Sequence, residues 1–447
     1  MPKVLARLAL ESISPISLGG YDTKMTRNIG GVQIEEPFRL SSLKGVWKWW
    51  MRAYVAGAAF DSGFDEKNQK IKTAEIVNNL LGSTELASSI GVKVLKTTYD
   101  LYKPKKWKEI PRLAQMRIKG IERYFALNLH AEVEIYERTA LTYPEERLLF
   151  GSLLTALKLG GLGKISRRGF GSLKVTIKNK SNEAIKDLTE IIKCIEQETN
   201  LNKLEPLVKV LIKGTYNTAE ELLKTTRGKS KPKNILPSIP CISLKNKLAF
   251  SLYLIKPLMQ MSVEDLLLII GQSVLRAGGR IPRGNLYAKE ASITAKLIGV
   301  EKDPLNMHVN KPLALFLGLP RKGKTKTEKT GYLTNKRRAS PLIFSLLNNS
   351  IISLTLMFSS DWPEEQIKWK GVLWKKKDKR IIGIKDRIYK NVKLDKRTLK
   401  VSFDSEEMKL LDIIQQIKSS LLDYFKDKNL QLKGQDLGMK IKEVSFL

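Results

Sequence analysis

Hydrophobic and polar positions alternate in two distinct ways along the first 180 residues. Apolar and polar residues alternate with period two in some segments, which predicts half-buried antiparallel strands. In others, apolar residues recur at helical spacing behind capping or first-turn residues, namely Ser41 or Ser42 in one case and Pro144 in the other. The predicted elements, in chain order, are a strand over 4–13, a helix over 41–57, a strand over 125–137, a helix over 143–161 and a strand over 172–177.

The second half of the chain repeats this order. A strand over 248–257 precedes a helix over 262–279, a loop with glycines and arginines over 278–284 and a strand over 291–299. A helix, a Gly/Arg loop and a strand in the same order in both halves indicate two copies of one domain type.

The predicted fold class is α+β, with antiparallel sheets and helices packed on one face. The N-terminal domain is expected over 1–185, a helical segment and linker over 186–240, and the C-terminal domain over 241–447. A strand over 352–358 and a closing helix over 406–425 belong to the last of these.

Charge narrows the partners that such a protein would have. The 447 residues contain 79 lysines and arginines against 45 acidic residues, a net charge of +34, while 42% of residues are hydrophobic. This apolar content excludes a disordered basic tail, and the charge favours a polyanion, nucleic acid first, as partner. An anionic membrane surface or a lysine-rich thermophilic proteome remains an alternative source of the charge.

Cysteine usage and the apolar runs bear on location. The two cysteines, Cys194 and Cys241, can build neither a disulfide framework nor a CxxC metal site. The N-terminus lacks the apolar core of a signal peptide, and no run reaches the ~18 apolar residues of a membrane helix. We therefore expect a cytoplasmic protein that needs no metal or cofactor.

The first Gly/Arg loop is the strongest candidate for phosphate binding. Its cations are Lys164, Arg167 and Arg168. The loop is not a phosphate-binding Walker loop, because its glycines follow a helix and precede a strand. A glycine-rich turn with solvated arginines is the alternative. The glycines that would let the backbone approach a ligand closely are Gly160, Gly161, Gly163, Gly169 and Gly171.

The first predicted helix carries a basic stripe beside its apolar face. Lys44, Lys48 and Arg52 are spaced by four, and Arg39 lies just before them. We expect Trp47 and Trp50 in the core, and Trp49 as a residue that could stack on a base. A basic stripe can also be a solvated helix face.

Candidates for catalysis are few. His130 falls on the polar face of a predicted strand next to Glu132 and Glu134, which would repel a phosphate, and His308 lies in a loop without an acidic partner nearby. The carboxylate pairs lie at helix starts or in loops, and no nucleophile motif occurs. The residues give no convincing active site.

Several motifs together resemble the RAMP superfamily of CRISPR systems, in particular its type III-B (Cmr) members. They are EEPFRLSSLKGVWKWWMRA, LLGSTELASSIGVKV, the loop GGLGKISRRGFGSL and, further on, NKRRASPLIF, which contains Arg337 and Arg338. The second loop reads GGRIPRGNLY, with Arg280 and Arg283, and departs from the family's double-arginine loop.

The resemblance implies two ferredoxin-like, RRM-like domains and a non-catalytic RNA-binding subunit of a type III-B effector complex. Such a subunit lies at the head of the complex near the 3′ end of the guide, beside other RAMP subunits, and helps to capture target RNA. Its implied partners are guide crRNA, target RNA and those subunits, with no membrane. Two alternatives stay open: a metal-independent RAMP endoribonuclease that uses His130 or His308, and a structural cap that touches RNA only incidentally.

Overall fold

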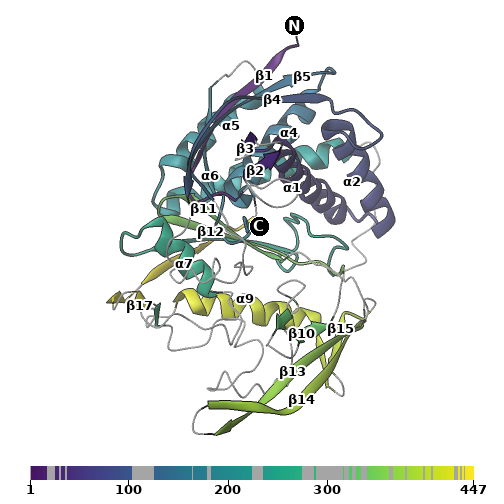
Figure 1. The fold of residues 1–447 in the computed structure, drawn as a ribbon. Helices are drawn as coiled ribbons and strands as arrows, with labels where there is room; N and C mark the ends of the chain where they lie inside the picture. The colour runs from purple at the N-terminus through teal and green to yellow at the C-terminus, as the bar shows by residue number, and fades with distance from the viewer. Residues whose placement is uncertain are drawn as a thin grey trace. The chain divides into compact units, whose positions relative to one another are not determined.

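The computed structural model places helices on antiparallel sheets, and Figure 1 shows the elements in chain order. It describes residues 2–17, 26–29, 32–35, 38–102, 125–163, 165–178, 183–223, 235–273, 286–287, 316, 322–324, 329–333, 340–361, 366–377, 380–395, 398–403, 406–426, 431–432, 435–436 and 438–446. The predicted α+β class is confirmed.

The first sheet has the strand order β4-β5-β1-β6, with every neighbouring pair antiparallel. Its strands are β1 (Val4–Ser12), β4 (Ile90–Tyr102), β5 (Phe125–Glu137) and β6 (Leu173–Ile177). The three strands predicted from alternation are confirmed. The short hairpin of β2 (Thr26–Ile29) and β3 (Val32–Glu35) follows β1.

Helices follow the first and third strands of this sheet. They are α1 (Leu40–Asp61), α2 (Glu66–Leu81) and α4 (Tyr143–Thr155), which continues as the π-helical turn η1 (Ala156–Gly160). The strand and helix order β-α-β-β-α-β, with the first strand between the third and the fourth, is that of a ferredoxin-like domain.

The two predicted helix starts have different outcomes. A capping box confirms the start of α4, because Thr142 and Glu145 bind each other's backbone and Pro144 lies in the first turn. The predicted Ser41 or Ser42 cap of α1 is wrong: Arg39 is the N-cap, with an extended backbone and no side-chain cap hydrogen bond. Leu40 is part of the apolar face that packs on the core, so the helix begins one residue before the serines.

Two more helices cover residues that were predicted to be helical in part. They are α5 (Glu183–Gln197) and α6 (Leu201–Leu223), and α6 begins well before the predicted segment at 219–224. Buried apolar residues recur at helical spacing on both. Residues 235–249 then run irregularly to the second sheet. The buried Asp61 at the end of α1 holds this stretch, since its carboxylate accepts hydrogen bonds from Ser243 Oγ and the Leu244 amide.

The second sheet has the order β11-β12-β7-β19. Its strands are β7 (Phe250–Pro257), β11 (Leu342–Asn348), β12 (Ile351–Met357) and β19 (Met439–Glu443), which confirms the predictions for β7 and β12. Along the chain, β7 is followed by α7 (Val263–Ser273), β11, β12, α9 (Leu410–Lys426) and β19. Chain order and sheet order repeat those of the first ferredoxin-like domain, as the repeated sequence order predicted.

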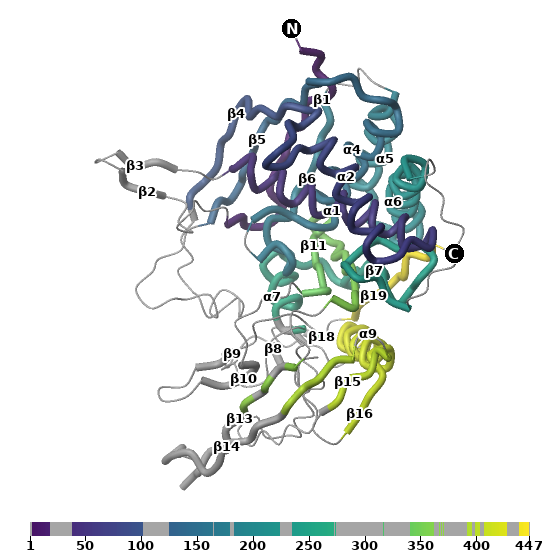
Figure 2. Tube along the Cα trace, turned by 90° about the vertical axis from the view of Figure 1, so that its right-hand side faces the viewer, coloured from purple at the N-terminus to yellow at the C-terminus, as the bar shows by residue number. Residues whose placement is uncertain are grey.

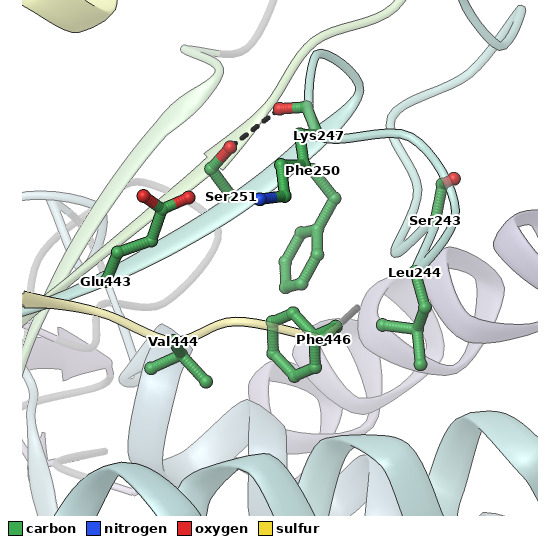
Figure 3. A pocket seen from close by; sticks show the side chains of 8 residues that line it. All are labelled: Ser243, Leu244, Lys247, Phe250, Ser251, Glu443, Val444 and Phe446. Carbon is green, nitrogen blue, oxygen red and sulfur yellow. Dashed lines mark hydrogen bonds between the residues drawn. The ribbon is translucent and has the colours of Figure 1, made fainter.

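The C-terminus is a strand, so the prediction that the chain closes on a helix is wrong. The Val444 amide donates to the Leu252 carbonyl at 2.9 Å, and the rings of Phe446 and Phe250 lie 5.5 Å apart (Figure 3). The alternation in the last residues is too short to separate a strand from a tail.

A third sheet precedes α9, with the order β16-β15-β14-β13-β10-β9. Its longest strands, β13 (Gln366–Lys377) and β14 (Arg380–Asp395), form a ribbon that is visible in Figure 2. Its other strands are β9 (Lys322–Lys324), β10 (Lys329–Leu333), β15 (Lys400–Phe403) and β16 (Glu406–Lys409). The predicted helix over 406–425 is therefore wrong in its first turn, where β16 pairs with β15. Short strands β8 (Leu286–Tyr287), β17 (Gln431–Leu432) and β18 (Gln435–Asp436) form a further small sheet.

The chain forms two compact units. Unit 1 comprises residues 1–267, 343–359 and 440–447, and unit 2 comprises 268–342 and 360–439. These units group residues by compactness, whereas the predicted limits at 185/186 and 240/241 follow the order of elements, so those limits stay a prediction. The predicted loop over 278–284 and strand over 291–299 lie outside the described residues, apart from that short β8.

Candidate nucleic-acid interface

One face of α1 carries positive charges that no described carboxylate neutralises. Lys44 and Lys48 are half-buried and Arg52 is exposed, and none of them forms an ion pair with a described residue. Burial lowers the pKa of Lys44, and the nearby charges of Arg138 and Lys48 lower it further. Burial and the charge of Arg52 lower the pKa of Lys48 in the same way. Like charges held this close together are stabilised by a bound anion.

Arg138 is a member of this group that the sequence reasoning missed. It follows β5, its guanidinium lies 5.9 Å from the centre of the Tyr136 ring, and it forms no ion pair with a described carboxylate. Gly91 of β4 makes room for that ring, since a Cβ there would lie 2.0 Å from it. The only signal in the sequence is a lone arginine directly after a strand. We call Lys44, Lys48, Arg52 and Arg138 the α1 cation cluster.

The end of the stripe is tied to the next element of the domain. The Lys48 ammonium donates a hydrogen bond to the Gly82 carbonyl, directly after α2. Gly82 has a φ of 76°, in the left-handed region that favours glycine. This contact orders one cation of the cluster in advance of any ligand.

The three tryptophans of α1 divide as predicted in burial. Trp47 and Trp50 are buried, and Trp47 Nε1 donates to the Leu149 carbonyl at 3.0 Å. Trp49 is half-buried and packs against the core. The Arg167 guanidinium lies 4.6 Å from the centre of its ring, and Trp50 meets it edge-on at 5.4 Å.

The Trp49–Arg167 contact joins the two strongest sequence candidates, the α1 stripe and the first Gly/Arg loop. Burial lowers the pKa of Arg167 to about 10, so the side chain is still charged at neutral pH. A cation over an indole face contributes on the order of 1 kcal/mol. Stacking of a base on Trp49 stays a prediction, and that base would share the ring with Arg167.

The glycines of the loop are required by the loop's own backbone. A Cβ on Gly171 would lie 1.8 Å from the Leu162 carbonyl oxygen, one on Gly161 would lie 2.9 Å from the Gly171 oxygen, and one on Gly160 would lie 2.5 Å from Trp50 Nε1. Four glycines also have a positive φ, namely Gly161, Gly163, Gly169 and Gly171. At the three positions with a close neighbour, the approach that the glycines permit is to atoms of this chain, and close approach to a ligand stays a prediction.

We expect Gly171→Ala to lower the free energy of unfolding by about 2 kcal/mol, because the new Cβ combines a strained φ with a backbone overlap. Gly45→Ala is the matched control. Gly45 lies within α1 with no atom near a Cβ, so we expect it to stabilise the protein by about 0.5–1 kcal/mol. Denaturant unfolding of the two variants measures both effects. Equal stabilities would contradict this role of Gly171.

The loop is also pinned on both sides. The Gly169 amide donates to the Phe344 carbonyl of β11 at 3.0 Å, and the Phe344 amide donates to the Arg167 carbonyl at 3.2 Å. Ser14 Oγ donates to the Gly169 carbonyl at 2.7 Å. Arg168 is buried, and its Nη1 donates to the Arg167 carbonyl. Arg168 thus has a structural contact in place, and its predicted phosphate contact is untested.

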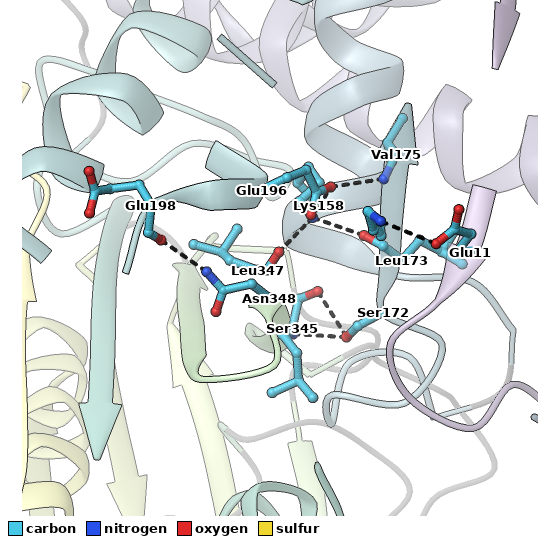
Figure 4. A network of polar contacts seen from close by, with 12 residues as sticks. Glu11, Lys158, Ser172, Leu173, Val175, Glu196, Glu198, Ser345, Leu347 and Asn348 are labelled. Carbon is cyan, nitrogen blue, oxygen red and sulfur yellow. Dashed lines mark hydrogen bonds and ion pairs between the residues drawn. The ribbon is translucent and has the colours of Figure 1, made fainter. Parts of the chain in front are cut away.

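Beneath the loop, a buried lysine fixes the segment that leads into it. Lys158 in η1 is fully buried and donates to the Leu173 carbonyl (2.9 Å), Glu196 Oε1 (2.6 Å) and the Leu347 carbonyl (2.6 Å), as Figure 4 shows. These contacts use all three ammonium donors. Burial lowers the pKa of Lys158, and the Glu196 carboxylate opposes that shift. One side chain therefore connects η1, β6, α5 and β11.

The remaining predicted RNA-binding residues are placed only in part. Arg39 is the half-buried N-cap of α1. The others lie outside the described residues, and so does His308: Lys164, Arg280, Arg283, Arg337 and Arg338.

The surface around His130 is occupied by ion pairs. His130 Nδ1 lies 3.9 Å from Glu11, and its Nε2 lies 3.6 Å from Glu132. Lys178 pairs with Glu132 at 2.6 Å, which lowers the pKa of that carboxyl group. A phosphate that approached His130 would meet two carboxylates, so this surface does not favour phosphate binding.

Two searches of the described residues found nothing. They contain no cluster of three or more histidine, cysteine or acidic residues that could hold a metal ion. Among the helices that the structure describes, none is long and apolar enough to cross a membrane.

Comparison with known proteins agrees with the order of elements. Residues 9–174 match the RAMP superfamily. The CRISPR system Cmr subunit Cmr1-1 of Pyrococcus furiosus is 32% identical over 163 residues, which cover 34% of this chain and 43% of that protein, less than half of its length.

Solved structures match over almost the whole chain. A chain of the type III-B Cmr-beta complex bound to cognate target RNA has a TM-score of 0.53 at 15% identity, over 94% of this chain and 100% of its own. The crystal structure of Cmr1 from Pyrococcus furiosus in its apo form has a TM-score of 0.49 at 19% identity, over 98% of both chains. Residues 9–174 therefore form a RAMP-superfamily domain, and the chain is a Cmr1-like protein.

Proposed function

We propose that this protein is a non-catalytic RNA-binding subunit of a type III-B CRISPR RNA-guided effector complex. The observation that carries the proposal is the α1 cation cluster, in which four cations lie together without a described carboxylate to neutralise them. Polyanion binding relieves this repulsion. The similarity to Cmr1-1 supports the choice of complex.

In that complex, the partners would be guide crRNA, target RNA and other RAMP subunits. We place the subunit at the head of the complex near the 3′ end of the guide, where it would help to capture target RNA. The joined α1 stripe and Gly/Arg loop would contact the sugar-phosphate backbone, and such contacts tolerate any sequence.

The ribonuclease alternative has no support from the described site. The carboxylates of Glu11 and Glu132 flank His130 at 3.9 and 3.6 Å. A general acid or base for RNA cleavage must lie beside a bound phosphate. We therefore keep RNA binding without cleavage as the proposal.

A salt titration with the purified protein tests the proposal. Single-stranded RNA should bind with an affinity that falls steeply with salt, by a log–log slope of about −0.7 for each phosphate contacted. A parallel incubation in EDTA should leave the RNA intact. Absence of binding would contradict the proposal, and cleavage in EDTA that a His130→Ala variant abolishes would favour the ribonuclease.

A further inference from the structure

The ribbon of β13 and β14 is strongly basic. Between Gln366 and Asp395 the sequence holds eleven lysines and arginines against three aspartates, a net charge of +8 over 30 residues. It also holds three aromatic residues, Trp369, Trp374 and Tyr389. In chain order, the ribbon belongs to an insertion between β12 and α9, in the middle of the second ferredoxin-like repeat.

The strand register sorts these residues onto two faces. Gln366 pairs with Lys393 and Lys368 pairs with Asn391, and all four are exposed. Val392 and Leu394, which alternate with them on β14, are buried. The base of the ribbon therefore has an outward face and an inward face.

Continuation of the same register extends the outward face along the ribbon. Lys370 pairs with Tyr389, and Val372 pairs with Arg387, before a bulge follows Leu373. The positions of this face carry no acidic residue. From Gln366 to the bulge they are Gln366, Lys368, Lys370 and Val372 on β13 and Arg387, Tyr389, Asn391 and Lys393 on β14.

This arrangement has the chemistry of a nucleic-acid strand site. Positions two apart on a strand are separated by about 6.8 Å, so the cations form a regular row that suits a regularly charged polyanion. Tyrosine among the cations is typical of single-strand binding, in which aromatic rings stack on bases. An acidic protein would be attracted by the charge, but it gives no reason for the tyrosine.

We propose that the outward face of the β13–β14 ribbon is a second RNA-binding surface of this protein, which holds the sugar-phosphate backbone of a single strand. Its cations are Lys368, Lys370, Arg387 and Lys393. The inference rests on the proposed RNA-binding function, and adds to it a surface in unit 2 that is separate in sequence from the α1 cation cluster in unit 1.

Two variants of the full chain with equal loss of charge test the ribbon. The ribbon variant replaces its four cations with glutamine. The control variant replaces four exposed lysines of α5 and α6 with glutamine: Lys186, Lys193, Lys203 and Lys213. Binding of single-stranded RNA is measured across a salt series, with polyglutamate as a competitor.

We expect the ribbon variant to reduce the magnitude of the salt slope by up to about 2.8, that is about 0.7 for each phosphate that a replaced cation would neutralise, and the control variant to leave it close to the original. Polyglutamate should compete weakly. Equal slopes for the two variants would overturn the ribbon proposal while RNA binding by the unaltered protein stands. Full competition by polyglutamate that depends on the ribbon would show an acidic-protein surface instead. No binding by the unaltered protein would overturn both proposals.

Discussion

Lys158→Met is expected to lower the free energy of unfolding by about 3–5 kcal/mol, because it leaves the buried Glu196 carboxylate without its cation. It also leaves the Leu173 and Leu347 carbonyls without the ammonium that they accept from. Methionine nearly preserves the length of the side chain, so a change in packing contributes little. Denaturant unfolding, followed by the fluorescence of the buried Trp47 and Trp50, measures the effect.

Lys70→Met provides the matched comparison. Lys70 pairs with Glu66 at 2.7 Å on the exposed surface of α2, where an ion pair of this spacing contributes about 0.3–0.5 kcal/mol. We expect this variant to unfold close to the original midpoint. If Lys158→Met were as stable as Lys70→Met, the buried ammonium would not be what connects η1, β6, α5 and β11.

Replacing all four members of the α1 cation cluster with glutamine should weaken binding of single-stranded RNA by about 10²–10³-fold at 0.1 M salt. The reason is that each phosphate neutralised by a cation releases about 0.7 of a counterion, and the variant leaves four phosphates without their cation. The same variant should reduce the magnitude of the salt slope by about 2.8. Equilibrium binding over a salt series measures both quantities.

The control variant on α5 and α6 separates a local site from net charge. It removes the same four charges, so a general field effect would weaken binding equally in both proteins. We expect the control to bind within a few-fold of the original protein. Equal reductions in affinity for the two variants would contradict a site on α1.

The sequence predicted the elements whose pattern repeats over several residues. Strands β1 and β5 alternate over nine and thirteen residues, and both lie where they were expected. The first turn of the last predicted helix failed, because Glu406–Lys409 joins a sheet edge through pairing with β15. Pairing with a distant strand leaves no signal within four residues.

The candidate site was predictable in its residue types and less so in its contacts. Spacing by four placed Lys44, Lys48 and Arg52 on one face of a helix. Neither Arg138, which joins them from the end of β5, nor the stacking of Arg167 on Trp49 has a local pattern, since both depend on packing between distant elements. The glycines indicated a tight loop, but the atoms that they approach closely belong to this chain.

Photo-crosslinking of guide and target RNA in an assembled type III-B complex that contains this protein tests the central claim most directly. Crosslinked peptides are then identified by mass spectrometry. The account predicts RNA crosslinks on this chain within Leu40–Asp61 and next to Arg138, and their loss in the glutamine variant of the α1 cation cluster. Crosslinks confined to neighbouring subunits would contradict it and would favour a structural cap.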